Sequence, residues 1–273
     1  MNYFRENIIV NTSGKTDYTA TLQAYIPDSS PELDLGRKRP AVLILPGGGY
    51  FFTSDRENEP IALKFAAEGI CAFVLKYSCA PARFPQALCE ALTSVKYIRE
   101  NAEKFFIDDG NIAVCGFSAG GHLAASVGVF WNRPFIAGHI GEFGAVMKPD
   151  KLILSYPVIK NGEHAHQGSF DLLLGENPTE DMLQLTSLEK QVGPDTPPAF
   201  IWHTYEDDVV PVQNALVFAN QLIANNIPVE LHVYRRGGHG LSLGSHVVDR
   251  DRTPGHNHVT ADWIDKAIRF IYD

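Results

Sequence analysis

The chain has 273 residues, of which 45% are hydrophobic and 11% aromatic, so it can bury one substantial core. Its formal net charge is -9 at pH 7, which argues against a nucleic-acid partner because such partners need clustered lysine and arginine. We find no signal peptide in the first residues and no apolar run of about 18 residues that could span a bilayer. A cytoplasmic protein without a membrane anchor is therefore expected.

Strands are predicted first along the chain, over 6–11 and 18–26, as an antiparallel pair with a turn at Ser13-Gly14. Within the second run Leu22, Ala24 and Ile26 alternate with more polar positions, as a half-buried strand does. Six later runs are rich in β-branched residues and indicate buried strands of a mostly parallel sheet. These runs cover 41–45, 70–76, 112–115, 152–156, 199–203 and 229–234.

Helices are predicted between these strands from apolar residues at helical spacing. The three predicted stripes are Ala91, Val95, Ile98 and Ala102; Val212, Leu216, Ala219 and Ile223; and Ile264, Ile268 and Ile271. The alternation predicts a three-layer α/β sandwich of the α/β-hydrolase type, as a single domain over 1–273. Segments 130–150 and 157–198 interrupt the alternation, and we expect them to form a partial cap or substrate wall.

The sharpest local motif is Gly116-Phe117-Ser118-Ala119-Gly120, which lies between a predicted strand and a predicted helix. Glycine on both sides suits the strained turn that lifts a nucleophilic serine above a sheet. The alternative is an ordinary Gly/Ser turn. The position between strand and helix favours Ser118 as a nucleophile.

A serine nucleophile needs a general base, and the base needs a carboxylate that orients it. Three consecutive acids follow the 199–203 strand, and we favour Asp207 because Asp208 suits a helix start and Glu206 can be solvated. His239 follows the 229–234 strand and is flanked by glycines, so we assign it as the base. His122, just after the serine, is expected to support the site by hydrogen bonding.

An oxyanion hole is predicted in the glycine-rich loop after the first parallel strand, because glycine amides can approach a substrate oxygen closely. We assign the backbone amides of Gly48, Gly49 and Ala119 to it. A phosphate-binding loop is the alternative, but the required Gly-Lys-Ser/Thr ending is absent. Tyr50 and Val210 are expected to contact the substrate.

Together these motifs resemble the α/β-hydrolase esterases, particularly the small bacterial acetylxylan-esterase-like carbohydrate esterases. The resemblance extends from about Arg39 to the C-terminus and includes Pro46-Gly47-Gly48-Gly49-Tyr50, Gly116 to Leu123, Asp207 to Pro211 and Gly238-His239-Gly240. It implies a serine esterase that deacetylates O-acetylated sugars or oligosaccharides. The loop begins with Pro46, where the related hormone-sensitive-lipase-like enzymes have histidine.

Two other functions stay open: a general short-chain carboxylesterase or lipase, and a non-catalytic binding protein with a hydrolase fold. The expected partner is a small-molecule ester, and neither a cofactor nor a metal is expected. A histidine-rich stretch, 246–258, has no known metal-ligand spacing and is interpreted as a polar loop. The oligomeric state, including a homodimer, is left open.

Overall fold

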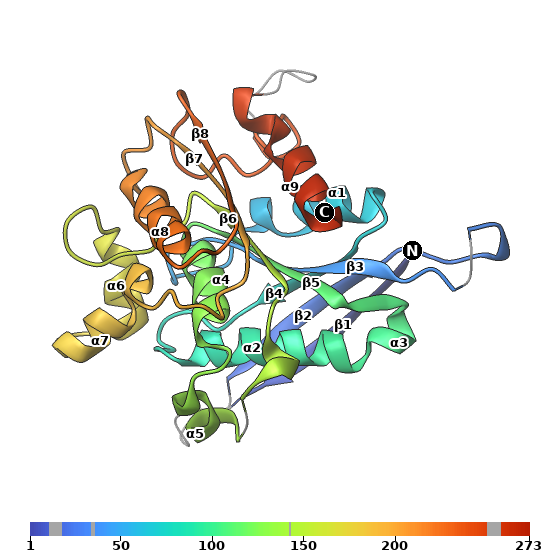
Figure 1. Cartoon of the computed structure of the whole chain (residues 1–273), viewed down its shortest axis with the longest axis horizontal. Coiled ribbons are helices and arrows are strands. Elements are labelled where there is room, and N and C mark those ends of the chain that lie inside the picture. The colour runs from blue at the N-terminus through green and yellow to red at the C-terminus, as the bar shows by residue number, and fades with distance from the viewer. Residues whose placement is uncertain (11–17, 34–35, 142, 250–257) are drawn as a thin grey trace.

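An eight-stranded, mostly parallel sheet forms the centre of the described part of the chain in our computed structural model (Figure 1). The structure describes residues 1–10, 18–33, 36–141, 143–249 and 258–273. The strands are β1 (Asn2–Ile9), β2 (Thr19–Ile26), β3 (Arg39–Leu45), β4 (Cys71–Lys76), β5 (Ile107–Phe117), β6 (Lys151–Ser155), β7 (Ala199–Thr204) and β8 (Val229–Tyr234). Across the sheet they lie in the order β1-β2-β4-β3-β5-β6-β7-β8.

The first two strands form an antiparallel edge of this sheet. β1 pairs antiparallel with β2, and β2 pairs antiparallel with β4, whereas every later pair of neighbours is parallel. The predicted leader pair and the predicted parallel sheet are therefore confirmed. β1 begins at Asn2, earlier than expected, and the predicted turn at Ser13-Gly14 lies outside the described residues.

The central strands are buried on both faces, and their side chains alternate between two cores. In β3, Val42 and Ile44 belong to one core, while Leu43 and Leu45 belong to the other, and all four are fully buried. This alternation follows from the two-residue period of a strand. Burial on both faces explains why these strands read as continuous apolar runs in the sequence.

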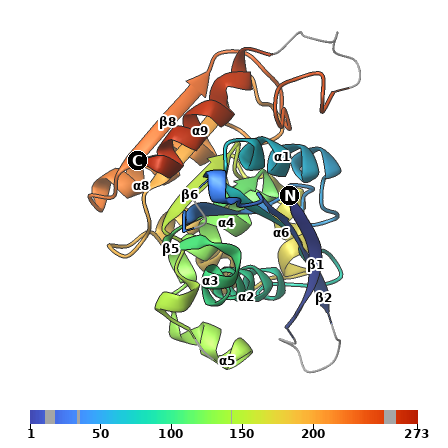
Figure 2. The same cartoon turned by 90° about the vertical axis from the view of Figure 1, so that its right-hand side faces the viewer.

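Helices cover both faces of the sheet. α1 (Glu59–Ala67) and α9 (Trp263–Tyr272) pack in one core, and α2 (Gln86–Glu100), α4 (Ala119–Phe130) and α8 (Gln213–Ala224) pack in the other. Figure 2 shows α1 and α9 on the opposite side of the sheet from α2. The short helices are α3 (Ala102–Phe105), α5 (Ala137–Ile140), α6 (Gln167–Leu174) and α7 (Glu180–Leu185). The predicted three-layer sandwich is confirmed.

Helices α2 and α9 carry their apolar stripes where the sequence predicts them. Ala91, Val95 and Ile98 of α2 are fully buried. α2 ends at Glu100, however, so Ala102 begins the separate helix α3. In α9, Ile264 and Ile271 are buried, and Ile268 packs partly buried against the same core.

Helix α8 is rotated relative to the sequence prediction, which is wrong for half of its stripe. Leu216 and Ile223, both predicted to face the sheet, are 38% and 61% exposed. The buried face instead carries the large apolar side chains of Phe218 and Leu222, whose removal from water stabilises this orientation. Asn214 near the start of the helix is fully buried and hydrogen-bonded to backbone groups of a neighbouring loop, which fixes this rotation.

The segment 130–150 packs on the outside of α2. Arg99 in α2 donates a hydrogen bond to the carbonyl of Val146 (2.9 Å), and Figure 1 shows α5 beyond one end of α4. The segment begins where the twelve-residue helix α4 ends, about 18 Å of helix from Ser118. We therefore do not retain this segment as a wall of the site.

The segment 157–198 lies beside Ser118. The amide of Val158 donates to the carbonyl of Ser118 (3.1 Å), and the carbonyl of Thr186 lies 2.9 Å from His122 Nε2. α6 and α7 belong to this segment. This segment, from the second of the two interruptions, therefore contacts the turn at Ser118.

Candidate active site

Ser118 stands between the end of β5 and the start of α4, with a backbone φ of 53°. A positive φ is strained for any residue with a side chain, and the surroundings must hold it in place. A Cβ on Gly116 would lie 2.1 Å from the carbonyl oxygen of Gly120, and a Cβ on Gly120 would lie 2.1 Å from that of Leu45. Only glycine fits at these two positions, so the turn is as tight as the motif predicts.

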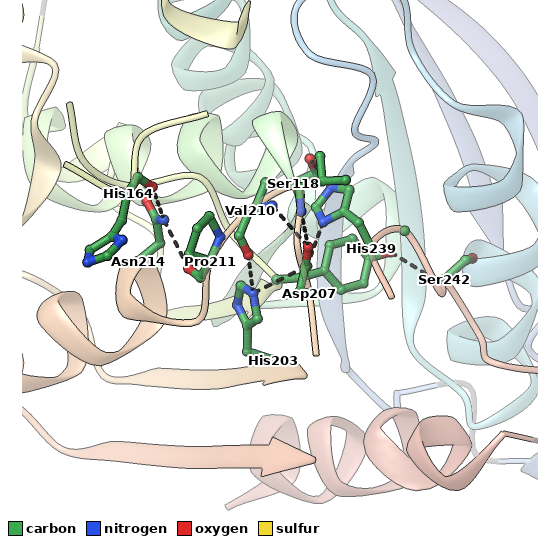
Figure 3. Close-up of polar contacts among 12 residues, drawn as sticks. Ser118, His164, His203, Asp207, Val210, Pro211, Asn214, His239 and Ser242 are labelled. Atoms are coloured by element: carbon green, nitrogen blue, oxygen red, sulfur yellow. Dashed lines mark hydrogen bonds and ion pairs between the residues drawn. The ribbon is translucent and has the colours of Figure 1, made fainter. Parts of the chain in front are cut away.

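Ser118, His239 and Asp207 form one hydrogen-bonded line (Figure 3). Ser118 Oγ lies 2.7 Å from His239 Nε2, and His239 Nδ1 lies 2.7 Å from Asp207 Oδ2. The three residues come from the loops after β5, β8 and β7, which meet because the carboxyl ends of parallel strands share one edge of the sheet. The structure thus brings together the three residues that the sequence suggested.

The surroundings of Asp207 keep its carboxylate ionised. Its side chain is fully buried, and Oδ1 accepts hydrogen bonds from the backbone amides of Val209 (3.0 Å) and Val210 (2.9 Å). Burial alone would raise the pKa of Asp207, but hydrogen bonds from His203 and His239 outweigh it and hold this pKa below its ordinary value. Asp207 is therefore a fixed negative charge beside the His239 ring.

A second histidine, His203, also contacts the Asp207 carboxylate. It is fully buried in β7, and its Nε2 lies 2.8 Å from the carbonyl of Val210 and 3.3 Å from Asp207 Oδ2. Because both neighbours are acceptors, Nε2 carries the proton and donates to them. Its position inside a predicted strand gave no sign of this role in the sequence.

The glycine loop after β3 lies beside Ser118. Gly48 and Gly49 have φ values of 132° and 65°, which favour glycine. Within the described residues, the amides of Gly48, Gly49 and Ala119 donate no hydrogen bond. Three unpaired N–H groups near a nucleophile can stabilise negative charge on a reacting oxygen.

Glu57 anchors this loop and was missed by the sequence analysis. Its buried carboxylate accepts a hydrogen bond from the amide of Gly47 (2.8 Å) and another from the Tyr156 hydroxyl (2.6 Å). The Tyr156 ring packs against the His239 ring at a centroid distance of 5.1 Å, and its hydroxyl accepts from the amide of Ser242 (2.9 Å). Glu57 thereby connects the glycine loop, through Tyr156, to the His239 ring.

His122 joins three segments around Ser118 by hydrogen bonds, as the sequence suggested. Its Nδ1 lies 2.8 Å from the Tyr50 hydroxyl, and its Nε2 lies 2.9 Å from the carbonyl of Thr186. Nε2 must donate to that carbonyl, so Nδ1 accepts from Tyr50. Burial lowers the pKa of His122 to about 4, which keeps the ring neutral near neutral pH.

Tyr50 and Val210, which we expected to contact the substrate, do not offer their side chains to it. Tyr50 is 3% exposed, and its hydroxyl lies 2.8 Å from His122 Nδ1. Val210 is fully buried, and its backbone amide and carbonyl are bonded to Asp207 and His203. Both residues support other residues of the site by hydrogen bonds and do not line it with their side chains.

No group of three or more His, Cys, Asp or Glu side chains that could hold a metal ion occurs in the described ranges. Of the histidine-rich stretch, Asp251 and His256 lie outside those ranges. His258 is described, and its Nδ1 lies 3.0 Å from Thr260 Oγ1 at the start of the last helical segment.

No helix within the described part of the chain is long and apolar enough to cross a membrane.

This fold and this geometry define an esterase-like α/β hydrolase: a buried carboxylate, an imidazole and a serine hydroxyl in line beside free amides can activate the hydroxyl for acyl transfer. The family model BD-FAE matches residues 22–222. The chain belongs to the BD-FAE family.

Two named relatives match most of this chain. The chain is 39% identical over 255 residues to endo-1,4-beta-xylanase B of Butyrivibrio fibrisolvens, covering 89% of this chain and 38% of that protein. It is 27% identical over 221 residues to the acetylxylan esterase of Xylanibacter ruminicola, covering 79% and 43%. It therefore spans less than half the length of either relative.

A solved structure with a similar fold is the acetyl ester-xyloside bifunctional hydrolase from Caldicellulosiruptor lactoaceticus. It aligns with a TM-score of 0.79 at 35% identity, covering 93% of this chain and 88% of that one. Because the alignment includes nearly all of both chains, the predicted α/β-hydrolase fold is confirmed over the chain and not only in its motifs.

Proposed function

We propose that this protein is a serine esterase that removes acetyl groups from O-acetylated sugars or short oligosaccharides. The observation that carries the proposal is the continuous line from Ser118 Oγ through His239 to Asp207, with both links 2.7 Å long. A line of this kind matches the geometry that general-base activation of a serine requires.

The first half of the reaction forms an acyl-enzyme. His239 Nε2 takes the proton of Ser118 as Oγ attacks the ester carbon, and a tetrahedral intermediate forms. The C–O bond to the alcohol then breaks, and the imidazolium of His239 gives its proton to the leaving oxygen. The acyl group stays on Ser118, while the Asp207 carboxylate stabilises the imidazolium.

The second half repeats these steps with water. His239 takes a proton from the water as its oxygen attacks the acyl carbon, and the bond to Ser118 Oγ breaks as His239 returns the proton to it. In both halves the amides of Gly48, Gly49 and Ala119 are proposed to donate to the oxyanion. This chemistry uses only side chains, backbone and water.

The sugar part of the proposal rests on the relatives. One is an acetylxylan esterase by name, and one structural neighbour is an acetyl ester-xyloside hydrolase. A fold alone does not identify a substrate. The same line of residues also fits a general short-chain carboxylesterase, and other relatives of this chain are named esterases without a sugar in the name.

The experiment is hydrolysis of a substrate panel by the wild type and Ser118→Ala. The panel contains acetylated xylose and xylo-oligosaccharides, p-nitrophenyl acetate, and p-nitrophenyl esters of longer acyl chains. We expect kcat/KM to be highest on the acetylated sugars and Ser118→Ala to be inactive. Higher kcat/KM on longer acyl esters would favour the carboxylesterase, and an absence of both turnover and fluorophosphonate labelling would favour a binding protein.

A further inference from the structure

His166 lies in the segment after β6, at the start of α6, and its ring faces the glycine loop beside Ser118. Its Cε1 atom lies 4.0 Å from the position that a Cβ on Gly49 would occupy. Burial lowers the pKa of His166, the nearby His239 lowers it further, and Asp207 acts in the opposite direction. A single half-buried imidazole is thus close to both the glycine loop and the base.

The backbone on both sides of His166 is held firmly. Asn214 of α8 is fully buried and donates to the carbonyls of His164 (2.9 Å) and Pro211 (3.0 Å), contacts that Figure 3 shows. On the other side, the Phe170 ring packs edge-on against His122, with centroids 5.4 Å apart. These contacts connect the segment around His166 to α8, to the loop that follows β7 and to α4. The His166 ring therefore has a defined position.

The neighbour of His166 determines which ring nitrogen carries the proton. His166 Nδ1 lies 2.8 Å from Ser169 Oγ, and Ser169 is buried. In the described part of the protein, His166 Nδ1 is the hydrogen-bond acceptor that the Ser169 hydroxyl reaches. Because a buried hydroxyl without an acceptor costs about 1–3 kcal/mol, Ser169 donates to Nδ1 and the proton of the neutral ring is on Nε2.

His166 Nε2 is consequently a hydrogen-bond donor without an acceptor in the described part of the protein. In the proposed reaction the leaving oxygen must lie next to His239 Nε2, which protonates it. His166 lies beside Gly49, and the charge of His239 acts on its pKa, so its free N–H is available to the alcohol half of an ester bound at Ser118.

We propose that His166 determines specificity by donating a hydrogen bond from Nε2–H to a hydroxyl oxygen on the alcohol half of the substrate, on the carbon adjacent to the one that carries the ester. The substrate class is then monoesters of vicinal diols, which includes partly acetylated sugars, in preference to esters of plain alcohols. This inference rests on the proposed function. It goes beyond that function because it names the chemical group that is recognised and the residue that recognises it.

The test compares two acetate esters of nearly equal size, 2-hydroxyethyl acetate and propyl acetate. We expect the wild type to prefer the hydroxyl-bearing ester, because one well-placed hydrogen bond is worth about tenfold in kcat/KM. His166→Phe keeps a planar ring without the donor, and it should lose about tenfold on 2-hydroxyethyl acetate with little change on propyl acetate. His166→Gln keeps an N–H donor and should retain part of the preference.

The control is His139→Phe, the same substitution in α5 on the outer side of α2. It should leave both kcat/KM values unchanged. Fluorophosphonate labelling of Ser118 is measured in every variant, and it should proceed at the wild-type rate in His166→Phe.

An unchanged ratio of the two esters in His166→Phe would overturn the inference, as would an equal loss on both esters. A wild type that hydrolyses neither ester but is labelled at Ser118 would overturn the recognition of small diol esters while leaving the proposed nucleophile intact. A wild type without turnover on any acetyl ester and without labelling would overturn the proposed function and this inference together.

Discussion

Ser118 Oγ and His239 Nε2 lie 2.7 Å apart although 121 positions separate the two residues in the chain. The contact exists because β5 and β8 run in the same direction within one sheet, so the loops that follow them open at the same edge. The proposed chemistry depends on this contact more than on any other.

Replacing Ser118 by alanine tests whether its hydroxyl is the nucleophile. We expect kcat to fall on the order of 10⁶-fold, because members of an interdependent triad each carry most of its effect. The control is Ser126→Ala, the same change inside α4, where the hydroxyl donates to the carbonyl of His122 (2.8 Å). Near-wild-type turnover in Ser118→Ala would refute the assignment.

Asp207→Asn tests the role of the buried carboxylate. The amide group would present N–H donors to His239 Nδ1, which forces the ring proton onto Nε2 and removes its ability to accept from Ser118. We expect kcat to fall on the order of 10⁴-fold, which is the loss typical of a serine triad whose histidine is held in the wrong tautomer.

The control for this substitution is Asp208→Asn, the same change one position along the chain. Asp208 is exposed, and we expect its variant to keep its activity. Steady-state kinetics on an acetyl ester separate the two variants. Comparable losses of kcat in both variants would mean that activity depends on the loop after β7 as a whole and not on the Asp207 carboxylate.

The local sequence was sufficient to predict Ser118, His239 and Asp207 as candidates because each follows the end of a predicted strand. Two of them are also flanked by residues with special backbone geometry: Gly116 and Gly120 around the serine, and glycines around His239. Strand ends and glycine turns are encoded in a few consecutive residues, which a single sequence displays.

The features that sequence analysis missed depend on packing between distant elements. Glu57 is one of several acids in a polar stretch, and only the approach of Tyr156 and Gly47 distinguishes it. Tyr50 follows the glycine loop, so it was expected in the substrate site, but tertiary packing turns its ring onto His122. The rotation of α8 was missed for the same reason, since Asn214 is fixed by backbone groups from another loop.

Glu57→Gln tests whether this buried acid positions the glycine loop and the base. The carboxylate accepts from both Gly47 and Tyr156, whereas an amide can accept with only one of its two ends. We expect kcat to fall about tenfold or more with a smaller change in KM, because the loop amides and the His239 ring would lose their exact placement.

Two further variants complete this test. Tyr156→Phe removes one of the two bonds and should lower kcat less than Glu57→Gln does. Glu59→Gln, an exposed acid two positions along, should be unaffected. If Glu57→Gln lowers thermal stability but leaves kcat unchanged, its role is in folding alone.

His122 makes the stability of the protein depend on pH in a defined window. The pKa of this buried ring is about 4 in the folded protein, against 6.5 for an ordinary histidine. Between these values the unfolded chain binds a proton that the folded protein does not, so the free energy of unfolding decreases as the pH falls from about 6.5 to about 4. The full separation corresponds to about 3 kcal/mol.

Urea unfolding of the wild type and His122→Gln at several pH values between 4 and 7 measures this contribution. Glutamine does not titrate, so the difference in unfolding free energy between the two proteins should change by up to about 3 kcal/mol across the window, whatever the constant cost of the substitution. Other titrating groups are common to both proteins and cancel in the difference. A His122→Gln curve parallel to the wild type would show that this ring does not stay neutral down to pH 4.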